Sequence, residues 1–288
     1  MALRTDINKI GVIGAGVMGT GIASCLAING IETVVYDVSE SALSKSNAII
    51  FREYDYLVDK NKIDKDKREL SEKLLDFTTH IKKACESDLI IEAAVENMDL
   101  KKIIYGQLDE LTPPNTILAS NTSSYSITAL STVIKNNSSR VVGMHFFNPA
   151  NIMKLVEVIR GEFTSDEVVK VIQELSLRLG KTPVICKDSP SFIVNRVARS
   201  FYGEALKVLG EGGIDLTQID SIMKEEGGFA LGPFELMDLI GIDVNLSVTK
   251  SVYESFFYDP KYKPHPIQQK MVDAGMLGKK TGKGFYSY

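Results

Sequence analysis

Hydrophobic and polar positions alternate differently in the two halves of this 288-residue chain. In the first half, short apolar runs are separated by longer segments with helical periodicity. The runs predict strands at 9–13, 32–37, 89–94, 117–120, 141–145 and 153–160, and the segment at 16–29 predicts a helix. Strands that alternate with helices are typical of a parallel, doubly wound α/β sheet covered on both faces. Right-handed crossovers then place the strand C-termini, and any ligand, along one edge.

Two segments depart from this alternation. Residues 39–80 are long, highly charged and helical in period, with an interruption at Asn61, and they predict a helical hairpin inserted after the second strand. This hairpin is either a solvated helix pair or a basic arm over a substrate cleft. Beyond residue 188 the chain has helical periodicity and glycine-rich turns with almost no strand pattern. We therefore expect one domain at 1–188 and an all-α domain at 189–288 that serves substrate binding and dimerisation.

Composition excludes several classes of protein. Hydrophobic residues make up 44% and charged residues 24%, with a formal net charge of −4, which is ordinary for a globular protein and gives no basic face for a nucleic acid. No apolar run is long enough to span a membrane, and the N-terminus does not resemble a signal peptide, so a cytoplasmic protein is expected. The three cysteines are far apart, which argues against a disulfide framework or a metal site.

A glycine motif follows the first strand. Gly14, Gly16 and Gly19 form G-x-G-x-x-G between a strand and a helix, and the next strand ends in Asp37. In this context the motif predicts a Rossmann-type dinucleotide site, with the pyrophosphate at the helix N-terminus and the acid on the adenosine ribose. Because Asp37 would repel a 2′-phosphate and no arginine follows it, NAD(H) is favoured over NADP(H). The alternative is a simple glycine turn with a strand-capping aspartate.

A histidine and a glutamate are candidates for acid–base chemistry. Period two along 153–159 places Glu157 on one strand face with Met153, Leu155 and Ile159, which are all apolar. A carboxylate in such a row needs a partner, and His145 ends the preceding strand at the edge where ligands bind. A carboxylate on one ring nitrogen fixes the tautomer and leaves the other nitrogen as a base. The alternative for His145 is an ordinary strand-end residue.

Two polar groups could complete the site. Ser123 lies in the Asn-Thr-Ser-Ser cluster at 121–124, which closes a strand, and Asn195 lies at the start of the second domain. Their hydroxyl and amide groups could hydrogen-bond a carbonyl oxygen that gains charge during reduction. Each could equally be a helix cap.

The same residues carry a resemblance to a known family. The segments VIGAGVMGTGIA, IEAAVEN, SNTSS, GMHFFNPANIMKLVEVI, KDSPSFIVNR, GGFALGPFELMDLIGID and GKKTGKGFYSY cover essentially the whole chain in order. They resemble the L-3-hydroxyacyl-CoA dehydrogenases, in particular the short-chain 3-hydroxybutyryl-CoA dehydrogenase type of bacteria. So many ordered matches make this resemblance specific.

The resemblance implies an activity and a role for each matching residue. It implies NAD-dependent interconversion of (S)-3-hydroxyacyl-CoA and 3-ketoacyl-CoA, with His145 as the base and Glu157 as its partner. Ser123 and Asn195 would contact the substrate oxygen. Lys60 on the helical hairpin would contact coenzyme A, which favours the reading of the hairpin as a basic arm. Further positions near the cofactor match at Glu96, Lys101, Asn148 and Lys280.

Two positions depart from the family pattern. Glu53 stands where some relatives use a serine towards coenzyme A, so that contact is in doubt. Asn151 stands where proline or valine is frequent.

Two other functions remain open. One is an NAD-dependent dehydrogenase of free hydroxy or sugar acids, which often uses a lysine as acid–base group; Lys154 is available but lies on the strand face opposite Glu157. The other is a structural protein that binds NADH without turnover. Comparing acetoacetyl-CoA with its free acid separates the first alternative, and NADH binding without oxidation would support the second.

Overall fold

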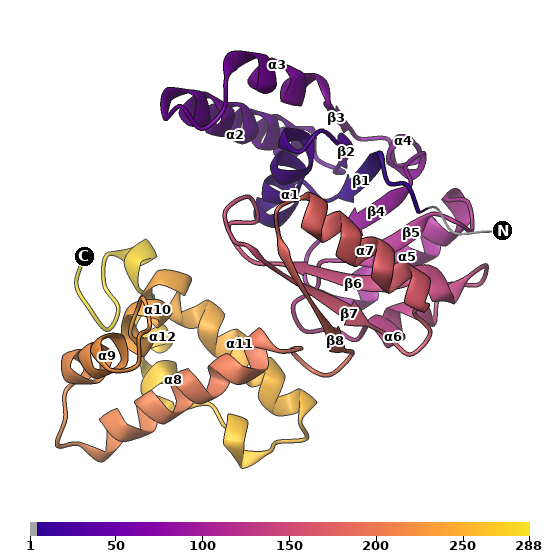
Figure 1. Ribbon diagram of the computed structural model, residues 1–288. Helices are drawn as coiled ribbons and strands as arrows, with labels where there is room; N and C mark the ends of the chain where they lie inside the picture. The colour runs from indigo at the N-terminus through magenta and orange to yellow at the C-terminus, as the bar shows by residue number, and fades with distance from the viewer. Residues whose placement is uncertain (1–4) are drawn as a thin grey trace. The chain divides into compact units, whose positions relative to one another are not determined.

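The computed structural model describes residues 5–288, and its internal contacts divide the chain into two compact units (Figure 1). The first unit ends at Ser189 and the second begins at Pro190. The expected domain boundary after residue 188 lies one residue before this division. Each unit is described by itself.

The N-terminal unit is built on one eight-stranded sheet. The strands lie in the order β3-β2-β1-β4-β5-β6-β7-β8, and neighbouring strands are parallel except β6 and β7, which are antiparallel. The strands are β1 (Lys9–Ile13), β2 (Glu32–Tyr36), β3 (Leu75–Thr78), β4 (Leu89–Glu92), β5 (Ile117–Ser120), β6 (Val141–Phe146), β7 (Leu155–Arg160) and β8 (Thr182–Lys187). The predicted doubly wound fold is confirmed, with one reversal of strand direction inside the sheet.

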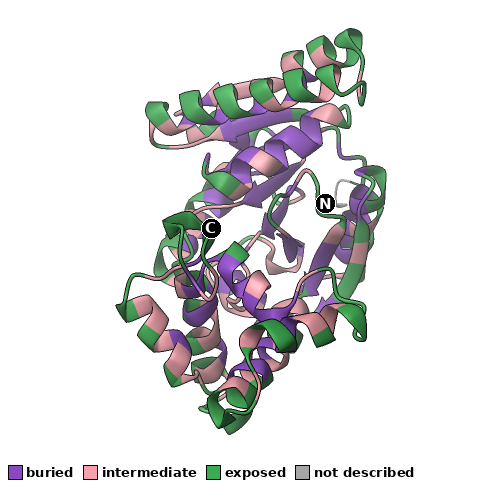
Figure 2. Cartoon of the chain, turned by 90° about the vertical axis from the view of Figure 1, so that its left-hand side faces the viewer, coloured by how far each residue is buried: buried purple, intermediate pink, exposed green. Residues whose placement is uncertain are grey.

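Helices cover both faces of this sheet. They are α1 (Val17–Ile28), α2 (Glu40–Asp59), α3 (Lys65–Lys73), α4 (Ile81–Cys85), α5 (Met98–Leu111), α6 (Ile127–Ser131), the 3₁₀ turn η1 (Ser138–Arg140) and α7 (Asp166–Arg178). Val142 and Met144 share one core with α1 and α7, whereas a side chain at Gly143 between them would meet Ile127 of α6. Alternate strand residues therefore serve opposite helical layers, and the strands are buried between them (Figure 2).

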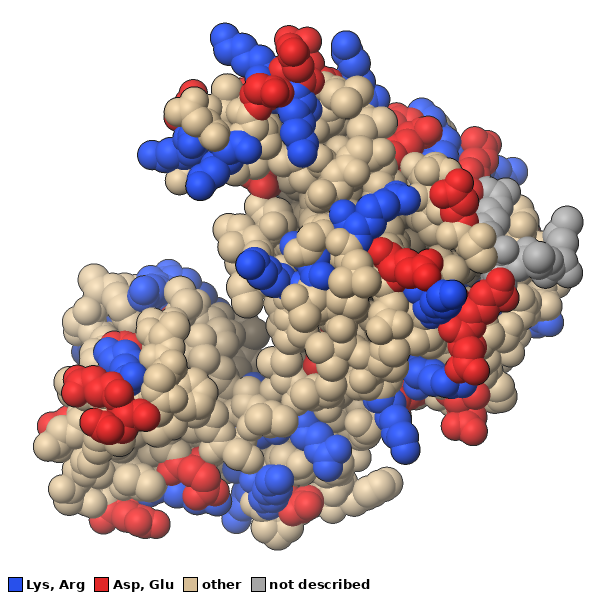
Figure 3. Space-filling model, in the orientation of Figure 1, with Lys and Arg blue, Asp and Glu red and all other residues tan. Residues whose placement is uncertain are grey.

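The segment at 39–80 forms a helical arm, although it is not helical throughout. Ser39 accepts a hydrogen bond from the Ala42 amide and so caps α2, and Asp64 caps α3 in the same way. Lysine side chains gather at the exposed tip of the arm, where α2 gives way to α3 (Figure 3), at Lys60, Lys62 and Lys65. The expectation of helix up to residue 80 is corrected at its end, because residues 75–78 form β3.

The two strands without a clear sequence pattern are the two edges of the sheet. β3 has four residues, and β8 leaves most of its side chains exposed or partly exposed. A strand that pairs on one side only, and packs little, needs no continuous apolar run. The apolar pattern that reveals the central strands is therefore weak at both edges.

The C-terminal unit is helical, as predicted. Its helices are α8 (Val194–Glu211), α9 (Leu216–Glu225), α10 (Pro233–Ile240), α11 (Ile242–Ser255) and α12 (Pro266–Asp273), with 3₁₀ turns η2 (Pro260–Tyr262) and η3 (Lys279–Thr281). Phe234 and Met237 of α10 are fully buried against Tyr202 and Leu206 of α8. This unit has its own hydrophobic core.

Candidate active site

The glycine loop joins β1 to α1 and needs glycine at two positions. Gly14 has φ +108°, and a side chain there would lie 2.7 Å from the carbonyl oxygen of Ala93. A side chain at Gly19 would lie 1.8 Å from the carbonyl oxygen of Gly14. The loop is therefore pressed between α1 and the segment after β4.

The same loop leaves the start of α1 open. Gly16 is the N-cap, no acidic residue lies in the first turn, and a side chain at Gly16 would meet nothing within 4 Å. The first-turn N–H groups of a helix have no partner within it, and they carry the positive end of the helix dipole. The loop and α1 therefore have the form of a phosphate-binding site.

Asp37 follows β2 directly and is bound to this loop. Its carboxylate accepts hydrogen bonds from the amide of Ala15 at 2.8 Å and from the amide of Ser39 at 2.9 Å. Asp37 is only partly buried, so it keeps lone pairs for further donors. These contacts hold an acid beside the phosphate-binding loop, where ribose hydroxyls could reach it.

A second group of charges lies at the C-terminal ends of β4 and β5. Lys101 is 1% exposed, and its ammonium contacts Glu92 at 2.6 Å and Glu96 at 3.2 Å. Glu92 also accepts a hydrogen bond from the Ser120 hydroxyl at 2.7 Å. Sequence reasoning named Lys101 and Glu96 but missed Glu92, although an acid that ends the apolar run LIIE was a visible signal.

Glu96 holds the polar cluster at 122–124. One of its carboxylate oxygens accepts from the Thr122 hydroxyl at 2.7 Å and from the Ser123 amide at 2.9 Å, and the Ser123 hydroxyl lies 3.2 Å away. Burial by itself would raise the pKa of Glu96, but the Lys101 ammonium and these donors outweigh it and lower the pKa. The structure therefore brings Glu96, Lys101 and Ser123 together through a charged carboxylate.

His145 and Glu157 lie directly opposite each other on the antiparallel strands β6 and β7. The Nδ1 atom of His145 is 2.7 Å from a carboxylate oxygen of Glu157, and the two residues are 6% and 1% exposed. Because Nδ1 contacts the carboxylate, acid–base chemistry at this ring would use Nε2. The reversal of strand direction produces this register.

Two residues outside the predicted set hold neighbouring parts of the site. The side-chain oxygen of Asn121 accepts a hydrogen bond from the Phe146 amide at 2.8 Å, which ties the end of β5 to the residue after His145. Asp188 accepts from the Ser126 hydroxyl at 2.7 Å and from the Thr128 amide at 2.7 Å. These contacts fix the loop that carries Ser123 on both sides, and only the three-dimensional fold identifies them.

The other predicted residues lie on other elements of the chain. Asn148 is exposed two residues beyond β6, and Lys60 is exposed at the end of α2 with its ammonium 5.6 Å from the Tyr56 ring centre. Asn195 lies in the first turn of α8 in the C-terminal unit, and Lys280 lies in η3, where it pairs with Asp243 at 2.5 Å.

The two departures from the family pattern are partners. Glu53 on α2 accepts a hydrogen bond from the side-chain amide of Asn151, and its other oxygen accepts from the Ser24 hydroxyl at 3.0 Å. Glu53 therefore ties α1 and α2 to the segment after β6. Both of its carboxylate oxygens are engaged within the N-terminal unit.

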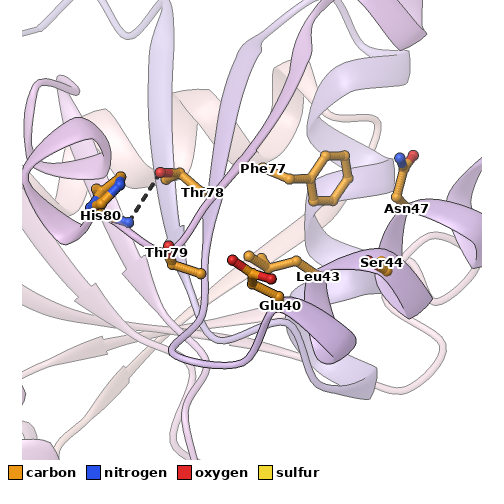
Figure 4. A pocket seen from close by; sticks show the side chains of 8 residues that line it. All are labelled: Glu40, Leu43, Ser44, Asn47, Phe77, Thr78, Thr79 and His80. Carbon is orange, nitrogen blue, oxygen red and sulfur yellow. Dashed lines mark hydrogen bonds between the residues drawn. The ribbon is translucent and has the colours of Figure 1, made fainter.

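A cavity of about 400 Å³ lies beside the start of α2 (Figure 4). Its lining consists of Glu40, Leu43, Ser44, Asn47, Phe77, Thr78, Thr79 and His80. None of these is a predicted catalytic or cofactor-binding residue, but the cavity adjoins Asp37, whose amide donates to the carbonyl oxygen of Thr78 at 3.3 Å. Within residues 5–288 there is no cluster of metal-ligating side chains and no helix long and apolar enough to cross a membrane.

Comparisons with known proteins agree with this geometry. Residues 9–189 match the family model of the NAD-binding domain of 3-hydroxyacyl-CoA dehydrogenase, and residues 192–288 match the C-terminal domain of the same family.

Individual relatives extend over nearly the whole chain. The chain is 44% identical to 3-hydroxyadipyl-CoA dehydrogenase of Escherichia coli over 99% of its own length, but it spans only 60% of that protein. It is 41% identical to 3-hydroxybutyryl-CoA dehydrogenase of Clostridioides difficile, covering 97% of this chain and 99% of the relative. The crystal structure of (S)-3-hydroxybutyryl-CoA dehydrogenase from Ralstonia eutropha superposes with a TM-score of 0.94 at 42% identity, over 98% of this chain and 99% of that one.

Proposed function

The chain belongs to the 3-hydroxyacyl-CoA dehydrogenase family, and we propose that it interconverts (S)-3-hydroxyacyl-CoA and 3-ketoacyl-CoA with NAD(H). The favoured pair is 3-hydroxybutyryl-CoA and acetoacetyl-CoA, because full-length relatives at about 40% identity carry that name. The observation that supports the proposal most is the 2.7 Å contact between His145 and Glu157.

The residues of the glycine loop fit a dinucleotide. Gly16 would let the backbone approach the pyrophosphate, Gly14 and Gly19 allow the tight turn and the close packing of the loop, and Asp37 would accept hydrogen bonds from the adenosine ribose. The Asp37 charge disfavours a 2′-phosphate, so NAD is preferred to NADP. When bound, NAD supplies the hydride acceptor of the oxidation and its reduced form supplies the hydride donor of the reverse reaction. Glu96, Lys101, Asn148 and Lys280 are the further positions proposed to lie near the cofactor.

His145 is the proposed acid–base group. In oxidation, its Nε2 removes the proton of the C3 hydroxyl, and in reduction it returns that proton to the C3 oxygen. Glu157 holds the ring through Nδ1 and stabilises the imidazolium that forms. The burial of both side chains makes this stabilisation stronger than it would be in water.

Ser123 and Asn195 are proposed to donate hydrogen bonds to the C3 oxygen. The Ser123 backbone amide is held on Glu96 at 2.9 Å, so its position is set by a charged and anchored carboxylate. Such donors favour the oxygen as it gains negative charge during reduction.

The helical arm is proposed to bind coenzyme A. The C-terminal unit is proposed to bind a second copy of the chain. Lys60 and its neighbouring lysines at the tip of the arm suit the phosphates of coenzyme A. The C-terminal unit exposes apolar side chains that a second copy could cover, among them Val197, Ile222, Phe229, Leu239 and Phe257. A cytoplasmic homodimer is therefore proposed, and its mass in light scattering should be twice 31.7 kDa.

The direct test is NADH oxidation by the purified protein. We expect rapid oxidation with acetoacetyl-CoA, much slower oxidation with free acetoacetate, and a strong preference for NADH over NADPH. A series of longer 3-ketoacyl-CoA substrates then defines the acyl range. NADH binding without oxidation by any acyl-CoA substrate would contradict the proposed activity.

A further inference from the structure

The C-terminal unit contains a buried arginine whose hydrogen-bond acceptors are all neutral. Arg199 on α8 is 5% exposed. Its Nε atom donates to the carbonyl oxygen of Asn195 at 3.0 Å, and its Nη1 atom donates to the carbonyl oxygen of Asn245 at 3.0 Å and to the Thr249 hydroxyl at 2.8 Å. The Tyr202 ring lies 5.0 Å from the guanidinium carbon. These contacts hold the side chain in place but supply no negative charge.

A buried cation without a counter-charge is unusual, because taking it out of water is costly. Another buried arginine, Arg140 in the N-terminal unit, forms an ion pair with the carboxylate of Asp109 at 2.8 Å. No carboxylate within residues 5–288 makes an ion pair with Arg199. Burial accordingly lowers the pKa of Arg199 to about 10, and only the Tyr202 hydroxyl acts in the opposite direction.

Arg199 lines a small cavity. The Nη2 atom makes no hydrogen bond to any residue that the structure describes, whereas Nε and Nη1 are both engaged. The cavity measures about 10 Å³, which is the room that a single water molecule takes. Chloride and bromide are larger than water, so binding either would require the lining side chains to move apart slightly, whereas a phosphate or a nucleotide would not fit.

The walls of this cavity are basic. Besides Arg199, the charged and titratable lining residues are Lys207, Lys261, Lys263 and His265, with no aspartate or glutamate among the lining residues. Lys207 is partly neutralised, because it pairs with the exposed Glu204 at 2.6 Å. The remaining lining residues are Tyr202, Gly203, Leu206, Thr249, Tyr262 and Gln268.

His265 adds a further donor to the wall. Its Nδ1 atom accepts a hydrogen bond from the Ile267 amide at 3.3 Å, so the neutral ring carries its proton on Nε2. Burial and then the nearby Lys207 charge lower the pKa of His265. The ring therefore adds a neutral N–H donor to the positive field of the lysines.

A second hydrogen-bond donor without an acceptor belongs to Asn245, whose carbonyl oxygen accepts from Arg199. Asn245 is fully buried, and its side-chain nitrogen Nδ2 has no hydrogen-bond partner. Its side-chain oxygen accepts from Gln268, a lining residue, at 2.8 Å. The group around the cavity thus has an excess of donors over acceptors, which is the opposite of what a cation would need.

We propose that this cavity binds one small monovalent anion of the chloride class, held by the Nη2 atom of Arg199. The anion supplies the counter-charge that the folded chain lacks, and the lysines around the cavity raise its local concentration. A water molecule could satisfy the hydrogen bond but not the charge. A carboxylate from a second copy of the chain would supply the charge but would occupy the place of the free anion.

The first test measures thermal stability in different sodium salts. The full chain is unfolded by heat in sodium chloride, sodium bromide and sodium gluconate at constant ionic strength. We expect chloride and bromide to raise the melting temperature in a saturable manner, as a ligand of the folded state does, and gluconate, which is too large for the cavity, to have no such effect. Equal melting temperatures in chloride and gluconate would overturn the proposal.

The second test locates the ion. A crystal grown in sodium bromide should show anomalous scattering within hydrogen-bond distance of Arg199 Nη2. Absence of bromide from the cavity overturns the proposal, whether water or a carboxylate of another copy fills the position.

Variants separate the site from a general salt effect. Lys263→Ala keeps Arg199 and its three hydrogen bonds, and it should raise the chloride concentration for half-maximal stabilisation by about two- to five-fold, the effect of one exposed charge. Lys270→Ala removes an exposed lysine of the same unit that does not line the cavity, and it should leave that concentration unchanged. Equal shifts in both variants would show general screening by salt and would overturn the proposed anion site.

Arg199→Met should abolish the dependence of the melting temperature on chloride. If this variant does not fold, Lys263→Ala decides the question alone.

Discussion

The two units hold their buried acids in different ways, whereas each contains a buried cation that donates to neutral oxygens, Lys181 in the first and Arg199 in the second. In the N-terminal unit, buried acids meet bases from other elements of the chain, in the pairs Glu92–Lys101, Asp109–Arg140 and Glu157–His145. In the C-terminal unit, the buried acids Asp220 and Asp238 accept hydrogen bonds from backbone amides instead, and the buried Arg199 donates to neutral oxygens.

The difference between the two units follows from the hydrogen-bonding groups that a sheet and a helical bundle place next to a buried acid. A sheet aligns residues of separate strands in register, so an acid on one strand can face a base on the next, as Glu157 faces His145. Packed helices present their ends, and the unpaired N–H groups at a helix start donate to a carboxylate, as the Phe234 and Glu235 amides of α10 donate to Asp220. We therefore expect charge-pair chemistry in the sheet unit and structural anchoring in the helical unit.

The largest expected effect lies in the charge pair assigned to catalysis. His145→Gln should lower kcat by ~10²–10⁴-fold, because the proton-transfer group is lost. NADH binding should survive, since the glycine loop and Asp37 lie on other elements, and NADH fluorescence titration measures this separately. Turnover like that of the unmodified protein would remove His145 from its role.

Breaking a purely structural pair should affect folding. Asp109→Asn leaves Arg140 buried without a counter-charge and should cost about 3–5 kcal/mol in urea unfolding. The matched control is Lys170→Met, which removes one partner of the exposed Lys170–Glu174 pair. It should change the free energy of unfolding little. A small effect of Asp109→Asn would mean that water reaches Arg140.

The same pair makes a pH prediction with a definite sign. Burial would raise the pKa of Asp109, but the Lys135 amide and the Arg140 guanidinium outweigh it and lower the pKa. A carboxyl whose folded-state pKa is lowered stabilises the fold above its ordinary value of about 4, and this contribution disappears as the pH falls through the folded-state pKa. Unfolding free energy measured from neutral to acid pH should therefore fall less steeply in Asp109→Asn than in the unmodified protein.

An acid anchored by backbone amides should matter less than a paired one. Asp238 accepts from the amides of Phe285 at 2.9 Å and Tyr286 at 2.8 Å. Asp238→Asn replaces one acceptor oxygen by a donor and should cost about 1–3 kcal/mol by chemical denaturation. A cost as large as that of Asp109→Asn would erase the distinction between the two units.

The smallest effect is expected at an exposed pair. Lys83 and Asp76 are 2.5 Å apart with side chains 50% and 41% exposed. Lys83→Met should change the free energy of unfolding by less than about 1 kcal/mol, and the change should shrink further in salt. A larger, salt-resistant loss would show that this contact is screened from solvent.

The sequence alone predicts those parts of the fold and of the candidate site whose residues are close together along the chain. The strand, glycine loop, helix and second strand up to Asp37 are contiguous, so each signal supports the next. An acid at 157 in an apolar strand face requires a partner, and this reasoning leads to His145 without coordinates.

Features that depend on distant residues were not predictable in this way. The edge strands β3 and β8 lack a strong apolar pattern, and the antiparallel pairing of β6 and β7 has no local signature. Glu53 and Asn151 are 98 positions apart, so their contact appears only in the folded chain.

The most direct measurement of the central claim is a crystal structure of the protein with NAD⁺ and acetoacetyl-CoA. The account predicts that His145 keeps Nδ1 on Glu157 and places Nε2 about 2.6–3.2 Å from the C3 oxygen of the substrate. A ternary complex in which another side chain holds that oxygen, with the imidazole turned away from it, would contradict the account.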